Sequence, residues 1–525
     1  MRAVSAIGIG VALTISASAN AQTSQKVLRF VPEYEAAVLD PVTSVLQVTH
    51  QTAFLVYDTL VGRDANGKIQ PQMADSFSTD PSGRITTFVL RPNQKFQDGG
   101  AVRSADAVAS VKRWAMRDNA GIWLAKFGMK YAIIDDRTFT IETPSPTPMV
   151  MEALAQPLLP VFVMREIDAN TPAEKPLDHF IGSGPFRFVA SEYVPGSRIV
   201  YERNADYVPR TEPASAFAGG KRVHVDRVEF RIMPDAATAA AALGKGEVDI
   251  WEAPPLDLIG LLKKQPDTTT IFLKTGGMML AMRPNHLLPP FNNVKARQAL
   301  LALVNQDDFM TVASGGDANN MRACHAFLGC STPARTEAGM EGFMKPDLAK
   351  ARALLKESGY DGRPVVLMQP SDLPLIHNVV EVAAQELRQA GFNVDVQAMD
   401  WATLVQRRGK QEPTDKGGWN LFITFTPDIV LQSPISTPFL DSPCKGGGWF
   451  GWPCDARTNE LRNEWANAVD PAKSNAVYQQ LQERSAEVVP YVPLGEYFTP
   501  LAYRKSIAGL VDAPLTLFWN VAKED

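Results

Sequence analysis

A stretch near the carboxyl-terminal end carries residue types that could hold a small charged ligand. The apolar run Leu421–Phe425 predicts a strand, and Asp428 follows it in a loop. A cation that loses its water needs an ionised partner, and such a charge-assisted hydrogen bond contributes about 1.5–3 kcal/mol. Asp428 could supply that partner, with Phe425 adding an apolar contact. The alternative is that Asp428 lies in a solvated loop or caps a helix.

Two tryptophans and one arginine are further candidates for ligand contact. Trp449 and Trp452 lie in a glycine-rich loop that ends at Cys454, where they could form the wall of a pocket or pack under a disulfide. Arg283 follows the apolar run Met278–Met282 and could meet a ligand carboxylate. A salt bridge between two parts of the protein is the alternative for Arg283.

One segment superficially matches a phosphate-binding loop. Residues Gly62–Ile69 have the glycine spacing and the lysine, but Ile69 stands where a Ser or Thr hydroxyl would bind Mg²⁺. Asn66-Gly67 between apolar runs instead predicts a two-residue type I′ hairpin turn. A nucleotide site is therefore not expected.

The remaining signals argue against a metal site and against the common hydrolase motifs. No His-x-x-x-His pair occurs, no Gly-x-Ser-x-Gly elbow occurs, and no cysteine pairs convincingly with a histidine. A catalytic triad can be assembled from distant residues, so a secreted hydrolase of peptides or esters stays the alternative function. The six scattered histidines are His50, His179, His224, His286, His325 and His377.

The length and the charge of the chain limit the classes of protein to which it can belong. A chain of 525 residues is too long for one ordinary core, so two or three lobes are expected. The 52 Lys+Arg nearly balance the 57 Asp+Glu, and no basic stripe occurs, so nucleic acid is not expected as a partner.

The first 21 residues have the features of a signal peptide. Arg2 precedes the apolar run Ala3–Ile15, and Ala19-Asn20-Ala21 fits the small-x-small rule for cleavage. No cysteine lies near that site, which disfavours a lipid anchor. No later segment offers 18 uninterrupted apolar residues, so we expect no membrane insertion and export to a Gram-negative periplasm.

Four cysteines follow this segment, and an even number in an oxidising compartment predicts disulfides. Three connectivities are possible. The local pairs Cys324–Cys330 and Cys444–Cys454 close the shortest loops, and each closure would contribute roughly 2–3 kcal/mol on the chain-entropy view. A pair of free buried thiols is the alternative.

From Lys295 onward the pattern alternates between helices and strands. The segments 351–368 and 383–399 each combine an amphipathic helix, a glycine that can end it (Gly359 or Gly391) and an apolar strand. This order predicts parallel strands joined by crossover helices.

The segment Leu60–Trp114 predicts short strands joined by turns and then a helix for which Ser104 is the expected N-cap. Its order of parts, with that of the segment Gly182–Tyr207, resembles the dipeptide/oligopeptide class of extracellular solute-binding proteins, which feed ABC importers. The matching features are Asp64–Gly67, Pro71, Met73-Ala74, Phe88–Arg91, Phe96–Gly99, Ser104–Val108, Gly182–Phe186, Tyr193, Pro195-Gly196, Arg203-Asn204 and Tyr207. Further matches at Gly246–Ile250, Pro290-Phe291 with Ala296–Leu300, and Ala349–Tyr360 extend the resemblance over nearly the whole mature chain.

The resemblance implies an α/β fold of the large type II class, with two discontinuous lobes, a hinge and a third domain. The implied ranges are 1–21 signal peptide, 22–58, 178–275 and 495–525 lobe I, 59–177 an additional domain packed on lobe I, and 276–494 lobe II.

The resemblance also implies a function: capture of a peptide or peptide-like solute by lobe closure, and its delivery to membrane permease subunits. No catalysis, cofactor or metal is implied, and we expect a monomer. Peptide-binding relatives pair an Asp beyond this strand with the peptide ammonium, and Tyr34 lies where relatives often touch ligand. The family pattern Trp-x-x-Asp-x-x-Asp-Pro is here Phe425-Thr426-Pro427-Asp428-Ile429, so peptides, glutathione-like conjugates, opines, oligosaccharides and metal–chelator complexes all stay open as ligands.

Overall fold

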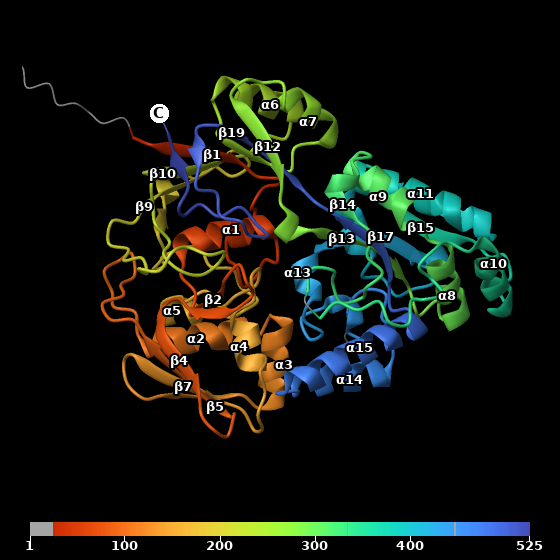
Figure 1. Cartoon of the computed structure of the whole chain (residues 1–525), viewed down its shortest axis with the longest axis horizontal. Helices are drawn as coiled ribbons and strands as arrows, with labels where there is room; N and C mark the ends of the chain where they lie inside the picture. The colour runs from red at the N-terminus through yellow and green to blue at the C-terminus, as the bar shows by residue number, and fades with distance from the viewer. Residues whose placement is uncertain (1–24, 333, 446–447, 525) are drawn as a thin grey trace, which may run out of the picture.

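The computed structural model describes residues 25–332, 334–445 and 448–524, and the predicted signal peptide lies outside these ranges. The described chain forms two large sheets, a smaller third sheet and helices on their faces (Figure 1). The predicted α/β class with two lobes is confirmed. Among the described residues, no helix has both the length and the apolar character needed to cross a membrane.

Lobe I is built on a seven-stranded sheet whose strands come from distant parts of the chain. Its central strand β1 pairs in parallel with β10 and β11, and β19 pairs antiparallel with β11 and β12. The helices α1 (Gln47–Val56), α6 (Ala236–Lys245) and α7 (Leu256–Leu262) pack with it. In sheet order the strands are β12 (Thr268–Phe272), β19 (Pro500–Arg504), β11 (Ile250–Glu252), β1 (Val27–Val31), β10 (Arg227–Arg231), β9 (Arg198–Arg203) and β8 (Phe186–Phe188).

Lobe II is built on a six-stranded sheet. Its strands in order are β14 (Met321–Arg322), β18 (Val492–Tyr497), β13 (Met278–Pro284), β17 (Leu421–Pro427), β15 (Val365–Pro370) and β16 (Val394–Met399). Its helices are α8 (Val294–Leu303), α9 (Gln306–Ser314), α10 (Leu348–Glu357), α11 (Pro374–Ala390), α12 (Trp401–Arg407), α13 (Asp428–Leu431), α14 (Ala456–Ala466) and α15 (Pro471–Val488). β15 pairs in parallel with β16 and β17, as the helix–strand alternation predicts, and Gly391 ends α11 in the left-handed conformation.

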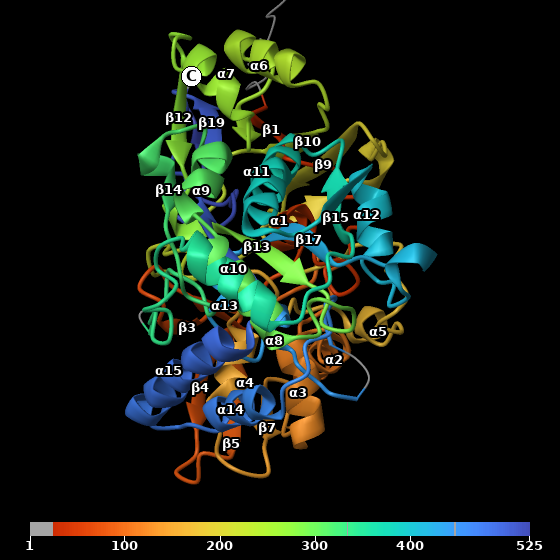
Figure 2. The same cartoon turned by 90° about the vertical axis from the view of Figure 1, so that its right-hand side faces the viewer.

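A third structural unit, here called the added domain, lies within residues 59–177. It contains a four-stranded sheet and the helices α2 (Ser104–Trp114), α3 (Asn119–Phe127), α4 (Met149–Leu154) and α5 (Glu166–Ala169). In sheet order its strands are β4 (Ala74–Thr79), β5 (Ile85–Leu90), β7 (Thr138–Glu142) and β6 (Lys130–Ile133). Both views place α3 of this domain beside α14 of lobe II (Figures 1 and 2).

The chain passes between the two large sheets twice after β12. It leaves lobe I through residues 273–277, between β12 and β13, and returns through residues 498–499, between β18 and β19. The return lies a few residues beyond the predicted boundary at 494, because β18 continues to Tyr497. We call these segments the first and second crossing.

Two local predictions are wrong by small amounts. Arg103, not Ser104, is the N-cap of α2, and the Asp106 carboxylate accepts the backbone N–H of Arg103 at 2.8 Å. The hairpin between β2 (Val61–Arg63) and β3 (Ile69–Pro71) has a five-residue loop instead of a two-residue type I′ turn. Only Gly67 there has a positive φ, because hydrogen bonds to Asp64 complete the wider turn.

Several motif residues meet at the buried carboxylate of Asp58, just after α1. Lys221 Nζ lies 2.6 Å from Asp58 Oδ1, and the Tyr207 hydroxyl donates to Oδ2 at 3.0 Å. Arg91 Nη2, from the added domain, lies 3.9 Å from Oδ2. Burial raises the pKa of Asp58, but the charges of Lys221 and Arg91 outweigh burial and lower it overall. Buried charge therefore joins the added domain to lobe I.

The motif glycines allow backbone to pack on backbone at the same junction. A Cβ added to Gly182 would lie 2.0 Å from the carbonyl oxygen of Val56, and one added to Gly184 would lie 2.7 Å from that of Leu55. Gln97 of the added domain donates its backbone N–H to Gly182 O at 2.8 Å. Two motifs far apart in sequence therefore form one interface.

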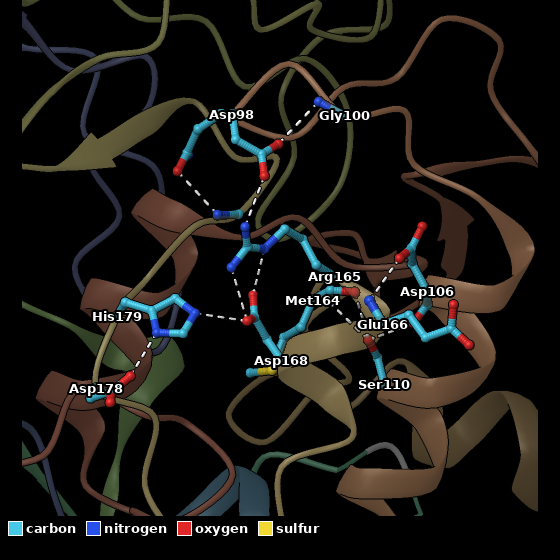
Figure 3. A network of polar contacts seen from close by, with 12 residues as sticks. Asp98, Gly100, Asp106, Ser110, Met164, Arg165, Glu166, Asp168, Asp178 and His179 are labelled. Carbon is cyan, nitrogen blue, oxygen red and sulfur yellow. Dashed lines mark hydrogen bonds and ion pairs between the residues drawn. The ribbon is translucent and has the colours of Figure 1, made fainter.

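A second polar network joins the added domain to the segment after it (Figure 3). Arg165 donates to both oxygens of Asp168 at 2.7 and 2.9 Å, and to Asp98 Oδ2 at 2.8 Å. The ring nitrogens of His179 lie 2.6 Å from Asp178 and 2.8 Å from Asp168, and these carboxylates raise the pKa of His179. Asp98 of the Phe-x-Asp-Gly motif is thus structural.

Replacing Lys221 with Met should destabilise the protein. The change leaves the Asp58 carboxylate buried beside a more distant Arg91, and breaking a buried pair costs about 3–5 kcal/mol. Urea unfolding followed by tryptophan fluorescence measures the effect. Lys345→Met, at an exposed position, is the matched control. Equal unfolding midpoints for the two variants would contradict this role for Lys221.

Candidate functional site

Asp428 begins α13 and lies where lobe II meets the first crossing. Its backbone N–H donates to Gly277 O at 2.8 Å. Its carboxylate is 1% exposed and accepts the backbone N–H groups of Cys330 at 2.5 Å and Ser331 at 3.0 Å. These bonds leave further lone pairs on the two oxygens, so contact with a ligand ammonium stays a prediction. In the structure the side chain fixes the loop that carries the Cys324–Cys330 disulfide.

Arg283 lies on β13 and is held by main-chain carbonyl groups of lobe II. Its guanidinium is fully buried and donates to the main-chain carbonyls of Phe450 at 2.8 Å and of Phe439 and Pro490 at 2.9 Å. Burial lowers the pKa of Arg283 to about 9. Nη2 donates no hydrogen bond to any described residue, so the predicted contact with a ligand carboxylate stays a prediction. No carboxylate of a described residue lies within ion-pair distance of Arg283, so the alternative salt bridge does not occur among them. Arg283 binds the second disulfide loop to the sheet.

Trp449 packs inside that loop, which the Cys444–Cys454 disulfide closes. Its ring is half-buried between two guanidinium groups, with Arg283 at 5.1 Å and Arg408 at 5.4 Å. The Phe439 ring lies 4.9 Å away. Packing under the loop, the alternative in the sequence, therefore occurs, and a contact with ligand stays a prediction.

Trp452 and Phe425 are also half-buried in lobe II. The Trp452 ring lies 5.8 Å from that of Trp419, and φ of Trp452 is 47°, in the left-handed region. Phe425 stacks on Trp401 at 6.1 Å with an interplanar angle of 19°. Both rings are partly accessible, so their predicted ligand contacts stay predictions.

Tyr34 lies on lobe I shortly after β1, and 37% of it is exposed. Its neighbour Glu33 is exposed too, and within the described residues its carboxylate forms no hydrogen bond or ion pair. Desolvation by the surrounding protein, followed by the charge of Glu252, raises the pKa of Glu33 to about 7. The protein around Glu33 therefore disfavours the charged form of this accessible carboxylate.

Glu33 acts electrostatically on the end of β18, close to the second crossing. Tyr497, the last residue of β18, has its pKa raised by burial and then by the charge of Glu33. Glu252, at the end of β11, is buried and accepts hydrogen bonds from Gln51 at 2.7 Å and Thr516 at 2.9 Å. Of Glu33, Glu252 and Tyr497, Glu33 carries the accessible carboxylate. The Glu252 carboxylate is buried and held by hydrogen bonds within lobe I.

Glu496, on β18, lies against the first crossing. A Cβ added to Gly277 would lie 1.8 Å from Glu496 Oε1, so only glycine fits there. Arg322 Nε donates to Glu496 Oε2 at 2.5 Å, whereas Oε1 accepts no hydrogen bond from any described residue. Burial and the charge of Asp428 raise the pKa of Glu496 to about 7, although Arg322 partly offsets them.

The sequence analysis missed Glu33 and Glu496. A usable signal exists for both residues. Glu33 lies two residues after the apolar strand Val27–Val31, and Glu496 is the only charged residue of the strand Val492–Tyr497. Acidic residues at the ends of buried strands are therefore candidates for positions near the crossings.

The arrangement suits binding of a small polar solute with a positive group. Acidic and aromatic side chains from both lobes lie near the two crossings: Glu33, Tyr34, Asp428, Glu496 and Tyr497. Among residues 25–332, 334–445 and 448–524, no group of three His, Cys, Asp or Glu side chains could hold a metal ion.

Comparison with known proteins identifies similar chains over nearly the full length. The model of bacterial extracellular solute-binding proteins, family 5, middle region, matches residues 68–444. A probable peptide ABC transporter periplasmic-binding protein of Sinorhizobium fredii is 36% identical over 98% of both chains. The fold resembles that of a dipeptide-binding protein from a Pseudoalteromonas species in complex with Met-Leu, with TM-score 0.78, 19% identity and coverage of 95% and 100%. It also resembles AgaA of A. tumefaciens in complex with agropinic acid, with TM-score 0.77, 22% identity and coverage of 95% and 99%.

Replacing Arg283 with Met should lower stability instead of acting first on ligand affinity. The change leaves three buried carbonyl groups without a hydrogen-bond donor. Each lost hydrogen bond to a charged donor costs about 1.5–3 kcal/mol if the surrounding structure does not rearrange. Thermal unfolding measures the loss, with the exposed Arg363→Met as control. Trypsin should also cleave faster after the exposed Lys445 in the released loop. An unchanged melting temperature for Arg283→Met would assign this residue to another role.

Proposed function

Because this chain belongs to family 5 of the bacterial extracellular solute-binding proteins, we propose that it captures a peptide-like solute by closure of its two lobes for an ABC importer. The family comprises transport proteins, and the proposed cycle makes and breaks no covalent bond. The S. fredii relative named as a peptide transporter component supports this class of solute.

The observation that carries the proposal is the pair of short crossings between the lobes. Residues 273–277 and 498–499 join the two large sheets after β12, and acidic and aromatic groups of both lobes surround them. Two short adjacent connections can allow rotation about one axis, which is the requirement for hinge closure around a ligand. Closure removes the ligand from water, which strengthens its polar contacts.

The proposed site of action is the periplasm, where the closed protein would present its solute to the permease subunits. The name of the S. fredii relative supports this location. The predicted signal peptide with cleavage after Ala21 is part of the same proposal. We propose that the protein acts as a monomer, because one chain supplies both lobes and both crossings.

The ammonium of the solute is proposed to pair with Glu33. Glu33 is accessible and free of partners within the described residues, whereas Asp428 is buried and already accepts two backbone N–H groups. Tyr34 and Tyr497 lie beside Glu33 and would supply flat contact surfaces. Asp428 would then influence binding indirectly, because it holds the loop at Cys330 and Ser331 and the first crossing at Gly277.

Protein purified without denaturation should retain its solute, because closed lobes release ligand slowly. Native mass spectrometry of the periplasmic protein should show a stoichiometric small adduct that disappears after mild denaturation. Calorimetry with Met-Leu and with agropinic acid then compares two solute classes. A protein that carries no adduct and binds no solute of either class would contradict capture. A product formed from an added peptide would favour the hydrolase alternative.

The Glu33→Gln variant tests the proposed ion pair while it preserves side-chain shape. Losing one charge-assisted hydrogen bond should weaken Met-Leu binding about 10- to 100-fold at pH 8. The pKa of Glu33 is raised to about 7, so the parent protein loses this charge as the pH falls through 7. The parent-to-variant affinity ratio should therefore approach one near pH 6.

This ratio is informative because the amine of the peptide titrates identically against both proteins. Glu412→Gln, at an exposed position, is the matched carboxylate control. A ratio that stays constant between pH 8 and pH 6 would place the ammonium elsewhere.

A further inference from the structure

Lobe II touches the added domain as well as lobe I. The described residues 433–445 and 448–467 of lobe II are here called the elbow, and its helix α14 lies beside α3 of the added domain (Figures 1 and 2). The indole N–H of Trp123 donates to Asn463 Oδ1 at 2.8 Å, and the hydroxyl of Thr147 donates to Ala466 O at 2.6 Å. These bonds join elements more than 300 positions apart in the sequence.

Gln156 makes a third polar contact in this interface, and its orientation is fixed. Its amide nitrogen donates to Asp118 Oδ1 at 3.2 Å and to Ala153 O at 3.1 Å. Asp118 is itself held as the N-cap of α3 by the backbone N–H groups that it accepts. The carbonyl oxygen of Gln156 is left to face the elbow, where Ser436 Oγ donates to it at 3.0 Å.

The interface also has an apolar part. Ile435 is 3% exposed and Ala466 is 0% exposed, and both belong to the apolar core of the added domain although lobe II supplies them. Trp465 packs against the same core. Separating the two parts would expose these side chains to water, at about 25 cal/mol per Å² of apolar surface.

Buried ion pairs attach the added domain to lobe I. Besides the Asp58 network, Arg113 of α2 donates to both oxygens of Asp40 at 3.1 and 2.7 Å, and both side chains are buried. The elbow belongs to lobe II, on the other side of both crossings. Any rotation about the crossings must therefore make or break the contacts between the elbow and the added domain.

We propose that the elbow and the added domain form a latch that holds the lobes closed, so that Trp123 and Gln156 raise solute affinity without touching the solute. This inference rests on the proposed lobe closure. A protein whose binding-competent form is partly populated binds with an affinity reduced by that fraction. The latch increases the closed fraction, whatever the solute, because its contacts exist only in the closed form.

The experiment measures the closed fraction directly, without any solute. Spin labels at Lys126→Cys and Val469→Cys, both exposed, report the distance between the added domain and lobe II. The four native cysteines are bonded in pairs and leave the labels only the introduced thiols. The test variants are Trp123→Phe, which keeps the stacking on Phe127 but loses the N–H donor, and Gln156→Leu.

Trp114→Phe is the matched control. Its indole also donates one hydrogen bond, to Leu159 O at 3.0 Å, but that bond lies inside the added domain. Melting temperatures of all variants separate loss of the latch from loss of fold.

The parent protein and Trp114→Phe should share a distance distribution that contains a short, closed component. Each latch variant should lower the closed-to-open ratio about 5- to 10-fold, since one hydrogen bond contributes about 1 kcal/mol. Variants with the parent distribution would overturn the proposal, as would a parent protein that shows only the long distance. The distance measurement needs no solute, so it tests the latch independently of the proposed function. If the variants behave as expected but the protein binds no solute, the latch stands and only the proposed function is contradicted.

Discussion

The packing of Glu496 against Gly277 is the constraint on which the two-lobed arrangement depends. Glu496 is buried on β18 just before the second crossing, and Gly277 is the last residue of the first crossing. Because a Cβ at position 277 would overlap the carboxylate, the two crossings can lie side by side only with glycine there. Arg322 and the backbone N–H of Asp428 hold the same point from lobe II. The crossings therefore act as one joint.

The motifs that suggested the family have structural roles in lobe I and the added domain. Arg91, Gly182, Gly184, Tyr207 and Asp98 attach the added domain to lobe I through buried charge and close backbone contact. A unit fixed in this way transmits any movement of lobe I to the elbow contact. The proposed ligand contacts lie outside those motifs, so the motifs can be shared by proteins that bind different solutes.

The sequence predicted the elements of the fold well, but not the hydrogen-bond partners of the candidate site residues. Amphipathic periodicity and helix-ending glycines located α11, β16 and the parallel pairing, because these features depend on neighbours along the chain. The roles of Arg283 and Asp428 depend on backbone groups brought from positions more than 90 residues away, such as Cys330 and Pro490. No local pattern records such partners. Glu33 was not predicted for the same reason, since Glu252 and Tyr497, whose charges and pKa values are linked to it, are distant in the sequence.

The central claim is that the lobes rotate as rigid bodies about the two crossings when solute binds. Small-angle X-ray scattering tests it most directly, on protein that carries its co-purified solute and on the same protein after the solute has been removed. The account predicts a smaller radius of gyration for the solute-bound form, because closure brings the masses of the lobes together. Identical radii for the two samples, with binding confirmed by mass spectrometry, would contradict it.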